Sequence, residues 1–258
     1  MKAFSIMFHD VIENGKWDSS GFPGPGAAVY KLEKNVFARH LDAIPKSAKV
    51  SRADGDWRQE SNPVFLTFDD GGTSFLHPIA DLLDARGWPG HFFITTGRVG
   101  TPGFLTKSEL REIRKRGHVV GSHSCSHPTR MSQCSRAQLQ QEWAGSLGFL
   151  QDLLGEPTPI ASVPGGYYSQ AVGETAVEAG IRVLFNSEPT SNIGQVSGAA
   201  LLGRYFVQRG MPPEISAAFA GGPGGPRLKQ AAVWKAKKIA KAAGGGLYLK
   251  IREKMLSR

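Results

Sequence analysis

The sequence lacks the features that mark disulfide-rich, secreted and membrane-spanning proteins. It has two cysteines in 258 residues, Cys125 and Cys134, which is too few for a disulfide framework. No stretch approaches the roughly 18 uncharged apolar residues that a membrane-spanning helix needs. His9 and Asp10 interrupt the apolar N-terminal stretch too early for a secretory signal. We therefore expect a cytoplasmic protein whose cysteines are reduced.

Acidic residues are nearly absent from the C-terminal segment. Residues 221–258 contain ten lysines and arginines and a single acid, Glu253, and so carry the whole net charge of +9. We expect residues 1–220 to form one domain and residues 221–258 to form a basic helical tail, with the GGPGGP sequence as a hinge. Such a tail is either solvated or lies on the anionic inner face of a membrane. The body is neutral and has no recognition motif, so nucleic-acid binding is not expected.

Apolar segments of strand length alternate with segments of helical periodicity along the first 207 residues. This alternation predicts parallel strands with helices packed outside, and six to seven such units favour a barrel over an open sheet. The fold class is therefore predicted as an α/β barrel. Strands are expected at 3–8, 64–68, 91–95, 118–121, 159–163, 182–185 and 201–207, and helices at 33–44, 75–86, 106–116, 135–154 and 169–179.

Two adjacent aspartates end one of the predicted strands, in the sequence VFLTFDDGG of residues 64–72. In α/β barrels, the carboxyl ends of the strands carry the catalytic residues. Neighbouring side chains of a strand point to opposite sides, so Asp69 and Asp70 can divide the work between cation binding and proton transfer. Taken alone, the pattern also suits a turn or a helix cap before glycine.

A second group of polar residues follows another apolar strand, in the sequence VVGSHSCSHP of residues 119–128. His123 and His127 are four residues apart, and on a helical turn this spacing places both rings on one face, where they can share a metal ion. Two imidazoles and one carboxylate suit a divalent transition metal that acts as a Lewis acid in hydrolysis. The two patterns together predict a metal site formed by His123, His127 and one of the two aspartates.

These motifs resemble those of the polysaccharide deacetylases of carbohydrate esterase family 4, which share the chitooligosaccharide-deacetylase homology domain. TFDDG at 67–71 resembles the first family motif and HSCSH at 123–127 the second. The resemblance implies a distorted (β/α)7 barrel and a hydrolase that removes an N-acyl group, expected to be acetyl, from an amino-sugar glycan or glycan precursor. It also implies Zn²⁺ or a similar divalent ion at Asp70, His123 and His127, with Asp69 as the general base.

The third family motif aligns with the sequence SVPGG of residues 162–166. The resemblance implies that the backbone N–H of Gly165 stabilises the oxyanion. Ser162 stands where many members carry an arginine that orients the base. Arg204, in the sequence LLGRYFV, is a candidate replacement, although we expect an ordinary surface ion pair for this residue.

No histidine follows His127, so the late histidine that protonates the leaving amine in many members is missing. A subset that resembles poly-N-acetylglucosamine deacetylases carries a histidine–aspartate pair at the end of the first strand, and FHD at 8–10 is similar to it. We therefore predict His9 as the general acid, because imidazole titrates near neutrality. The alternative is a buried, hydrogen-bonded histidine. Further candidates for orienting groups or binding substrate are Asp10, Tyr167 and Glu188.

A function of a different class stays open on the same barrel. A chain without the usual arginine and the late histidine would suit a non-catalytic carbohydrate-binding or scaffold protein. The retained Asp69 favours an enzyme, because a site that only binds sugar needs no base.

Overall fold

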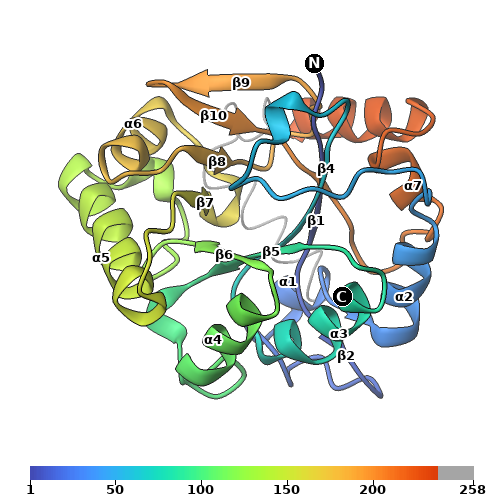
Figure 1. The fold of residues 1–258 in the computed structure, drawn as a ribbon, viewed down its shortest axis with the longest axis horizontal. Coiled ribbons are helices and arrows are strands. Elements are labelled where there is room, and N and C mark those ends of the chain that lie inside the picture. The colour runs from blue at the N-terminus through green and yellow to red at the C-terminus, as the bar shows by residue number, and fades with distance from the viewer. Residues whose placement is uncertain (238–258) are drawn as a thin grey trace.

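The computed structural model of the chain describes residues 1–237, which form a curved central sheet surrounded by helices (Figure 1). Eight strands of the sheet run parallel and the last is antiparallel. The predicted α/β architecture is therefore confirmed. In spatial order the strands are β11 (Tyr205–Phe206), β1 (Phe4–Phe8), β4 (Val64–Phe68), β5 (Gly90–Ile94), β6 (Val119–Ser122), β7 (Ile160–Ser162), β8 (Val183–Phe185), β10 (Ala199–Leu202) and β9 (Ile193–Val196).

A small second sheet pairs β2 (Val11–Ile12) with β3 (Leu32–Glu33) in parallel. The loop between these two strands contains the short helix α1 and passes beside the site described below. The helices of the described residues that carry α labels are α1 (Pro25–Ala28), α2 (Lys34–Asp42), α3 (Asp81–Asp84), α4 (Lys107–Lys115), α5 (Arg136–Leu154), α6 (Gln170–Glu178) and α7 (Ile215–Phe219).

Local sequence signals explain where several helices begin and end. Thr106 and Ser135 each form a capping box, with Glu109 and Gln138 respectively, at the start of α4 and α5. The helix expected at 75–86 is instead broken into the π-type turn Leu76–Ala80 and α3. The break coincides with His77, whose backbone is extended, because a residue before proline avoids the helical conformation.

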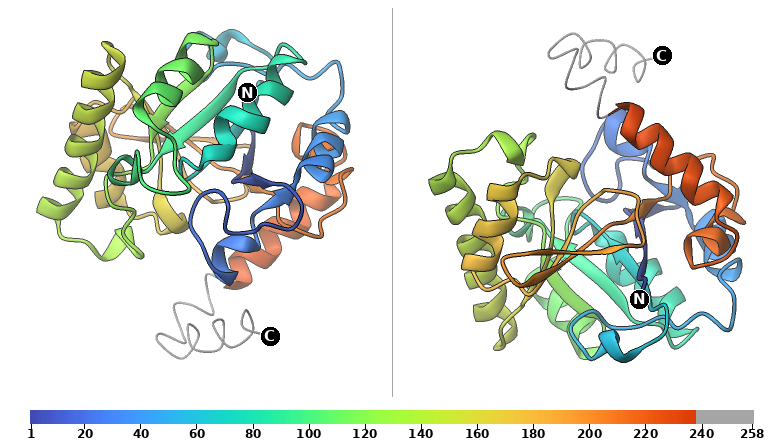
Figure 2. Two further views of the ribbon diagram at one scale, coloured as in Figure 1. Left: turned by 90° about the horizontal axis from the view of Figure 1, so that it is seen from below. Right: turned by 90° about the horizontal axis from the view of Figure 1, so that it is seen from above.

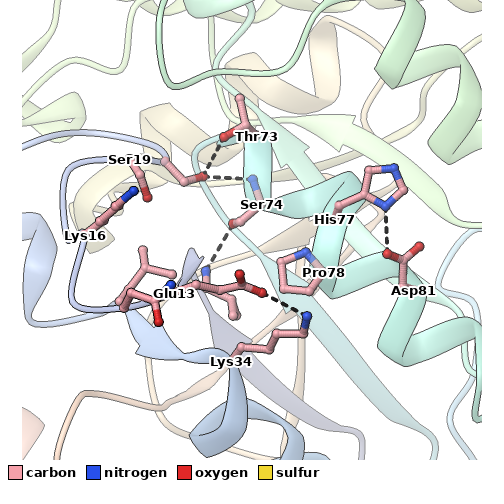
Figure 3. A pocket seen from close by; sticks show the side chains of 13 residues that line it. Glu13, Lys16, Ser19, Lys34, Thr73, Ser74, His77, Pro78 and Asp81 are labelled. Atoms are coloured by element: carbon pink, nitrogen blue, oxygen red, sulfur yellow. Dashed lines mark hydrogen bonds and ion pairs between the residues drawn. The ribbon is translucent and has the colours of Figure 1, made fainter.

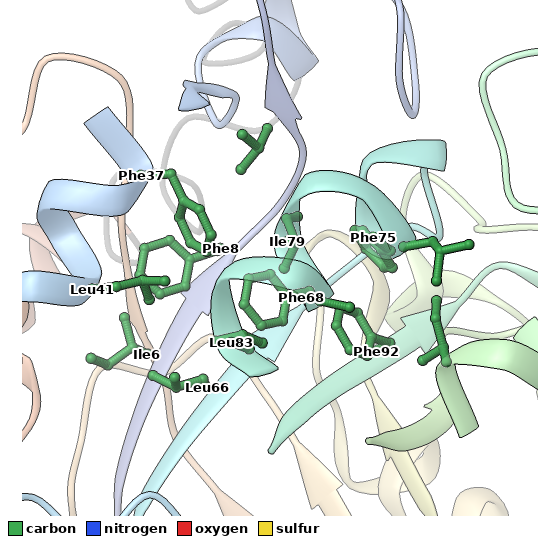
Figure 4. Packing of buried hydrophobic residues seen from close by; sticks show 14 of the residues in the cluster. Ile6, Phe8, Phe37, Leu41, Leu66, Phe68, Phe75, Ile79, Leu83 and Phe92 are labelled. Atoms are coloured by element: carbon green, nitrogen blue, oxygen red, sulfur yellow. The ribbon is translucent and has the colours of Figure 1, made fainter. Parts of the chain in front are cut away.

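A row of buried aromatic rings fixes the position of β4, the strand that carries the two aspartates (Figure 4). Phe68 stacks on Phe8 of β1 with ring centroids 5.6 Å apart and on Phe92 of β5 at 5.1 Å. Phe37 of α2 packs edge-on against Phe8 at 5.3 Å. Burial of each such side chain contributes about 1.5–3 kcal/mol. The residues that follow β4 therefore start from a rigid base.

The strand predicted at 201–207 is wrong, because the chain breaks there into β10 and β11. β10 pairs with β8 and β9, whereas β11 pairs with β1 at the opposite end of the sheet. Only Gly203 and Arg204 separate these strands. The chain therefore passes directly from one end of the curved sheet to the other, across the gap between β10 and β11, which we call the seam of the barrel. A side chain at Gly203 would place its Cβ 2.2 Å from the carbonyl oxygen of Glu188, which explains the glycine.

The first part of the predicted tail is helical and packs on the barrel. Residues 225–237 form a helix that begins inside the expected hinge and lies along the side of the barrel, in red in Figure 2. The Gln230 side-chain amide accepts a hydrogen bond from the backbone N–H of Phe206 and donates one to its carbonyl oxygen, both at 3.0 Å. The boundary at residue 220 stays a prediction, and tail residues 238–258 lie outside the described part of the chain. Among residues 1–237, no helix has both the length and the apolar character needed to cross a bilayer.

Candidate active site

The side chains predicted to form the site come together at the carboxyl ends of the parallel strands. His9 follows β1, Asp69 and Asp70 follow β4, and His123 follows β6. This is the end at which α/β barrels place their reacting groups. Residues far apart in the sequence therefore share one site because the parallel strands all deliver them to the same face.

Asp70, His123 and His127 form the predicted cluster, with one ligand atom from each residue within 4.8 Å of the others. Asp70 Oδ1 lies 3.5 Å from His123 Nε2 and 3.6 Å from His127 Nε2. Ligands at about 2.1 Å from one tetrahedral ion lie about 3.4 Å apart, so the spacing fits a shared divalent cation. Burial and the neighbouring charges of Asp69 and Asp10 raise the pKa of Asp70. They thus disfavour the ionised carboxylate, and a bound cation would stabilise it.

The two histidines do not lie on a helical turn, and that part of the sequence prediction is wrong. Residues 123–127 form a loop in which Ser124 and His127 have positive φ angles of 63° and 59°. The Ser124 hydroxyl accepts a hydrogen bond from the His127 backbone N–H at 3.1 Å and helps to hold this turn. Non-glycine residues with positive φ cost of order 1–3 kcal/mol and cluster at functional sites. Asp70 is a third example, with φ of 92°.

Glu142 on α5 holds the same loop from outside and was not predicted. Its carboxylate accepts hydrogen bonds from the backbone N–H groups of Cys125 and Ser126 at 2.9 and 2.8 Å, and from the Ser126 hydroxyl at 2.5 Å. The charged acceptor thus satisfies two consecutive N–H groups between the two metal-ligand candidates. Nothing in the sequence near Glu142 signals this contact, because its partners are 16 and 17 residues away.

Asp69 forms a buried, two-pronged ion pair with Arg204. Arg204 Nη1 donates to Asp69 Oδ1 at 2.6 Å and Nη2 donates to Oδ2 at 2.7 Å, and the arginine is fully buried. The expectation that Arg204 makes a surface ion pair is therefore wrong. Burial alone would raise the pKa of Asp69, but the charge and hydrogen bonds of Arg204, together with the charges of His123 and His9, outweigh it and hold this pKa below its usual range.

The seam of the barrel positions Arg204. Its Nε donates to the carbonyl oxygen of Asn186 at 3.0 Å, and its backbone N–H donates to the carbonyl oxygen of Glu188 at 2.9 Å. Nη1 also lies 3.4 Å from the Thr67 hydroxyl. Glu188 therefore supports the arginine through its main chain, whereas a substrate contact of its side chain stays a prediction.

Ser162, at the end of β7, lies between the base candidate and a metal-ligand candidate. Its hydroxyl donates to Asp69 Oδ1 at 3.1 Å and lies 2.6 Å from His123 Nδ1. His123 Nδ1 is also 3.1 Å from the Ser162 carbonyl oxygen. All three side chains are buried, and burial lowers the pKa of His123 to about 3.

His9 lies beside this group, with its ring 4.7 Å from the ring of Tyr30. Burial lowers the pKa of His9 to about 4, while the nearby negative charge of Asp69 acts in the opposite direction. The buried Nδ1 atom of His9 has no hydrogen-bond partner within residues 1–237, so the structure does not support the alternative of a hydrogen-bonded structural histidine.

Asp10 anchors two loops at the edge of the site. Its Oδ1 accepts hydrogen bonds from the hydroxyls of Ser20 at 2.5 Å and Ser74 at 2.8 Å. The approach is so close that a Cβ on Gly72 would lie 1.8 Å from the same oxygen. Burial raises the pKa of this carboxyl. These contacts support the loops, and a substrate-binding role for Asp10 stays a prediction.

Lys31 is a second unpredicted support, on the loop between β2 and β3. Its buried ammonium group donates to the carbonyl oxygens of Trp17, Ser20 and Phe22 at 2.6, 2.7 and 2.7 Å. All three donors are therefore used within one loop. The loop places the Phe22 ring 5.0 Å from the ring of His127, where it forms one wall of the site.

The turn after β7 carries the remaining predicted residues. Gly165 has φ of 60°, a conformation that favours glycine, within the turn Pro164–Gly166. A Cβ at Gly165 would lie 3.4 Å from the Tyr167 ring, so the two residues pack together. Their predicted roles at the oxyanion and at the sugar stay predictions.

A separate hollow of about 380 Å³ lies between the β2 region and the Thr73–Asp81 segment (Figure 3). Two pairs of its polar side chains are in contact, Lys34 with Glu13 at 2.8 Å and His77 with Asp81 at 2.7 Å. None of the metal-ligand candidates lines it. The predicted metal-ligand residues therefore lie at the strand ends and outside this hollow.

Comparison with known proteins finds relatives among the polysaccharide deacetylases. Residues 57–184 match the family model of polysaccharide deacetylases. The chain is 25% identical over 190 residues to YxkH of Bacillus subtilis, a match that covers 70% of this chain and 67% of that protein. It is 31% identical over 131 residues to a peptidoglycan-N-acetylglucosamine deacetylase of Bacillus cereus, covering 50% of this chain and 59% of the relative. The chain thus spans about three fifths of that relative.

Solved structures show the same fold. The deacetylase PplD of Streptococcus pyogenes, in complex with acetate, superposes with a TM-score of 0.69 at 19% identity, covering 83% of this chain and 96% of that one. IcaB of Ammonifex degensii gives a TM-score of 0.64 at 19% identity, covering 85% and 97%. The predicted (β/α)7 barrel class is confirmed by this likeness. The family match and the relatives together show that residues 57–184, about half of the chain, are similar to the polysaccharide deacetylase family.

Proposed function

We propose that this chain is a metal-dependent hydrolase that removes an N-acyl group, first of all N-acetyl, from an amino-sugar glycan or glycan precursor. One observation supports the proposal most strongly. The three metal-ligand candidates cluster next to Asp69, a buried carboxylate that Arg204 keeps ionised. Asp70, His123 and His127 would hold Zn²⁺ or a similar divalent ion. When bound, this ion would supply Lewis-acid chemistry to the amide carbonyl and to the attacking water.

Asp69 has one acceptor position left for the proton of that water. A carboxylate offers about four lone-pair positions. Arg204 and Ser162 take two on Oδ1, and Arg204 takes one on Oδ2. The open position is on Oδ2, the oxygen that lies 3.9 Å from His123 Nε2, on the side of the metal-ligand candidates. We therefore assign Oδ2 as the proton-accepting atom.

His9 is the group that would deliver a proton to the leaving amine. Because burial lowers its pKa to about 4, the ring is neutral in the resting protein. The leaving nitrogen needs one proton when its bond to the acyl carbon breaks, and the proton that Asp69 takes from the attacking water can supply it. His9 is the neighbouring imidazole that would pass this proton to the nitrogen. The backbone N–H of Gly165 would stabilise the oxyanion of the tetrahedral intermediate.

The rival function, a sugar-binding or scaffold protein that has lost its catalytic groups, is not favoured. It depended on the absence of both the usual arginine beside the base and the late histidine, for which His9 is the proposed replacement. Arg204 supplies the guanidinium from the seam of the barrel, and a binding site has no use for a carboxylate held ionised in the interior.

The basic tail supports a further part of the proposal, peripheral association with an anionic membrane from the cytoplasmic side. The helix of residues 225–237 exposes Leu228 by 73% and Val233 by 43%, on a segment that also carries Lys229 and Lys235. Each basic residue near an anionic surface contributes about 1 kcal/mol. Co-sedimentation with phosphatidylserine vesicles should decrease when lysines of residues 229–254 are changed to glutamine. Sedimentation equal to that of the unchanged chain would contradict the membrane role.

Acetate release from N-acetylated chitooligosaccharides by the zinc-loaded chain tests the reaction. Asp69→Asn should reduce the rate by about 10²–10⁴, the usual range for loss of a general base. Asp152→Asn changes an exposed aspartate on α5 and is the matched control, which should keep full activity. Equal rates for the two variants would contradict the role of Asp69, and no release from any N-acetylated sugar would contradict the function.

His9→Ala tests the acid separately. The variant should bind the metal ion with unchanged stoichiometry, because His9 is outside the ligand cluster, while kcat collapses. A variant with normal kcat would remove His9 from the mechanism.

A further inference from the structure

We infer that Ser162 is a positioning residue that fixes the ring tautomer of His123. The ion pair between Asp69 and Arg204 determines which atoms of this hydrogen-bonded chain donate and which accept. The four side chains form one buried chain of hydrogen bonds, from Arg204 through Asp69 and Ser162 to His123. The inference rests on the proposed function, because the tautomer matters only if His123 binds a metal ion.

The direction of the chain follows from what each atom can donate. Arg204 bonds both oxygens of Asp69, so this carboxylate is ionised and can only accept hydrogen bonds. The Ser162 hydroxyl, 3.1 Å from Asp69 Oδ1, must therefore donate its single proton there. The same hydroxyl can then only accept from His123 Nδ1 at 2.6 Å, which requires a proton on Nδ1.

The backbone gives an independent argument for the same tautomer. The Ser162 carbonyl oxygen lies 3.1 Å from His123 Nδ1, and a carbonyl oxygen has no proton to donate. With Nδ1 protonated, a neutral imidazole presents its lone pair at Nε2. This is the atom that lies 3.5 Å from Asp70 Oδ1 and would bind the ion. Such hydrogen bonds to the second ring nitrogen orient metal-binding histidines in general.

The serine also suits the relocated arginine. Ser162 on β7 contacts the aspartate that follows β4, although β5 and β6 lie between these two strands in the sheet, and it also contacts His123, which follows the adjacent strand β6. Ser162 and Arg204 share the same oxygen of Asp69, at 3.1 and 2.6 Å. A longer side chain at Ser162 would compete with the guanidinium for this oxygen. The small hydroxyl therefore joins the base to a metal ligand and leaves the base its arginine.

Two measurements test the inference without any turnover. In the metal-free protein, ¹⁵N NMR of the histidine rings should show His123 protonated at Nδ1. In a competition titration of Zn²⁺ against a chromophoric chelator, Ser162→Ala should bind the ion roughly 10–100-fold more weakly than the unchanged chain. Ser5→Ala is the matched control, because Ser5 is equally buried and its hydroxyl has no hydrogen-bond partner in the described residues. It should leave the affinity unchanged.

Ser162→Thr keeps the hydroxyl and should restore most of the affinity, which separates the hydrogen bond from a general packing defect. A proton on Nε2 of His123 in the unchanged protein would overturn the inference even if the variants fail to fold, and so would a Ser162→Ala chain that binds Zn²⁺ as tightly as the unchanged one. If these measurements agree with the inference while no N-acetylated sugar is hydrolysed, the proposed function fails and the role of Ser162 stands.

Discussion

Replacing Arg204 by methionine would remove the guanidinium from Asp69 and keep a long, unbranched side chain in its place. Both residues are buried, and both oxygens of the carboxylate are bonded to the arginine. Removing one partner of such a pair leaves a buried charge without compensation, which typically costs about 3–5 kcal/mol. We expect the free energy of unfolding of Arg204→Met at neutral pH to be lower by this amount.

The dependence of this loss on pH has a definite sign. In the unchanged chain the pKa of Asp69 lies below its unfolded value, so the pair adds stability above the unfolded pKa and loses it as the pH falls through the folded pKa. In Arg204→Met the burial of Asp69, the largest influence on its pKa, is opposed only by the weaker effects of His123 and His9, so we expect this pKa to rise. Protonation then relieves the buried charge in acid, so the stability difference between the two chains should be greatest at neutral pH and should shrink as the pH falls.

Urea unfolding followed by tryptophan fluorescence measures these energies, since Trp57 and Trp143 are buried. Asp69→Asn and the double variant with Arg204→Met complete a double-mutant cycle, in which the double variant should lose less than the sum of the single losses. Arg182→Met, at an exposed arginine, is the control and should change stability by about 0.5 kcal/mol at most. Additive losses, or an Arg204→Met chain as stable as this control, would refute the reasoning.

Three further predictions concern the loop and the ion. Glu142→Gln should weaken zinc binding several-fold in calorimetry, because the amide oxygen is a poorer acceptor than the carboxylate for the two loop N–H groups; unchanged affinity would contradict this. Gly97→Ala should lower Tm and activity, because its Cβ would lie 2.7 Å from the Cys125 carbonyl oxygen. The control is Gly145→Ala in α5, where a Cβ has free space, and this change should stabilise the protein by about 0.5–1 kcal/mol. A chelator should abolish activity and lower Tm, and added Zn²⁺ should restore both; activity that survives complete metal removal would exclude a metal-dependent reaction.

The metal-ligand candidates could be predicted because each signal is local. Asp70 directly follows an apolar strand, and His123 and His127 belong to one five-residue motif. The loop conformation of this motif could not be predicted, because it depends on the positive φ of Ser124 and on the distant carboxylate of Glu142. Spacing thus predicted the cluster of metal-ligand candidates correctly and predicted the wrong backbone conformation for two of them.

Arg204 shows why the sequence could name a candidate partner for the base but favoured a surface ion pair for it. It lies 135 residues from Asp69 in sequence, within a segment whose apolar character predicted one continuous strand. Only the crossing from β10 to β11 at Gly203 turns the arginine into the barrel. Strand periodicity describes which residues face the core but not where a strand leaves its sheet. The remaining elements were predicted where caps and periodicity agreed, as at α4 and α5.

The amide of Gln230 has a consequence for how the chain can be shortened. It makes the two hydrogen bonds with Phe206 that another strand would make at the open edge of β11. An unprotected edge is a template for pairing with a second molecule, and so for aggregation. A chain cut at residue 220 would expose this edge, whereas a chain cut after residue 237 keeps it covered. The helix of residues 225–237, which the sequence predicts as part of a tail, is therefore expected also to protect the barrel from self-association.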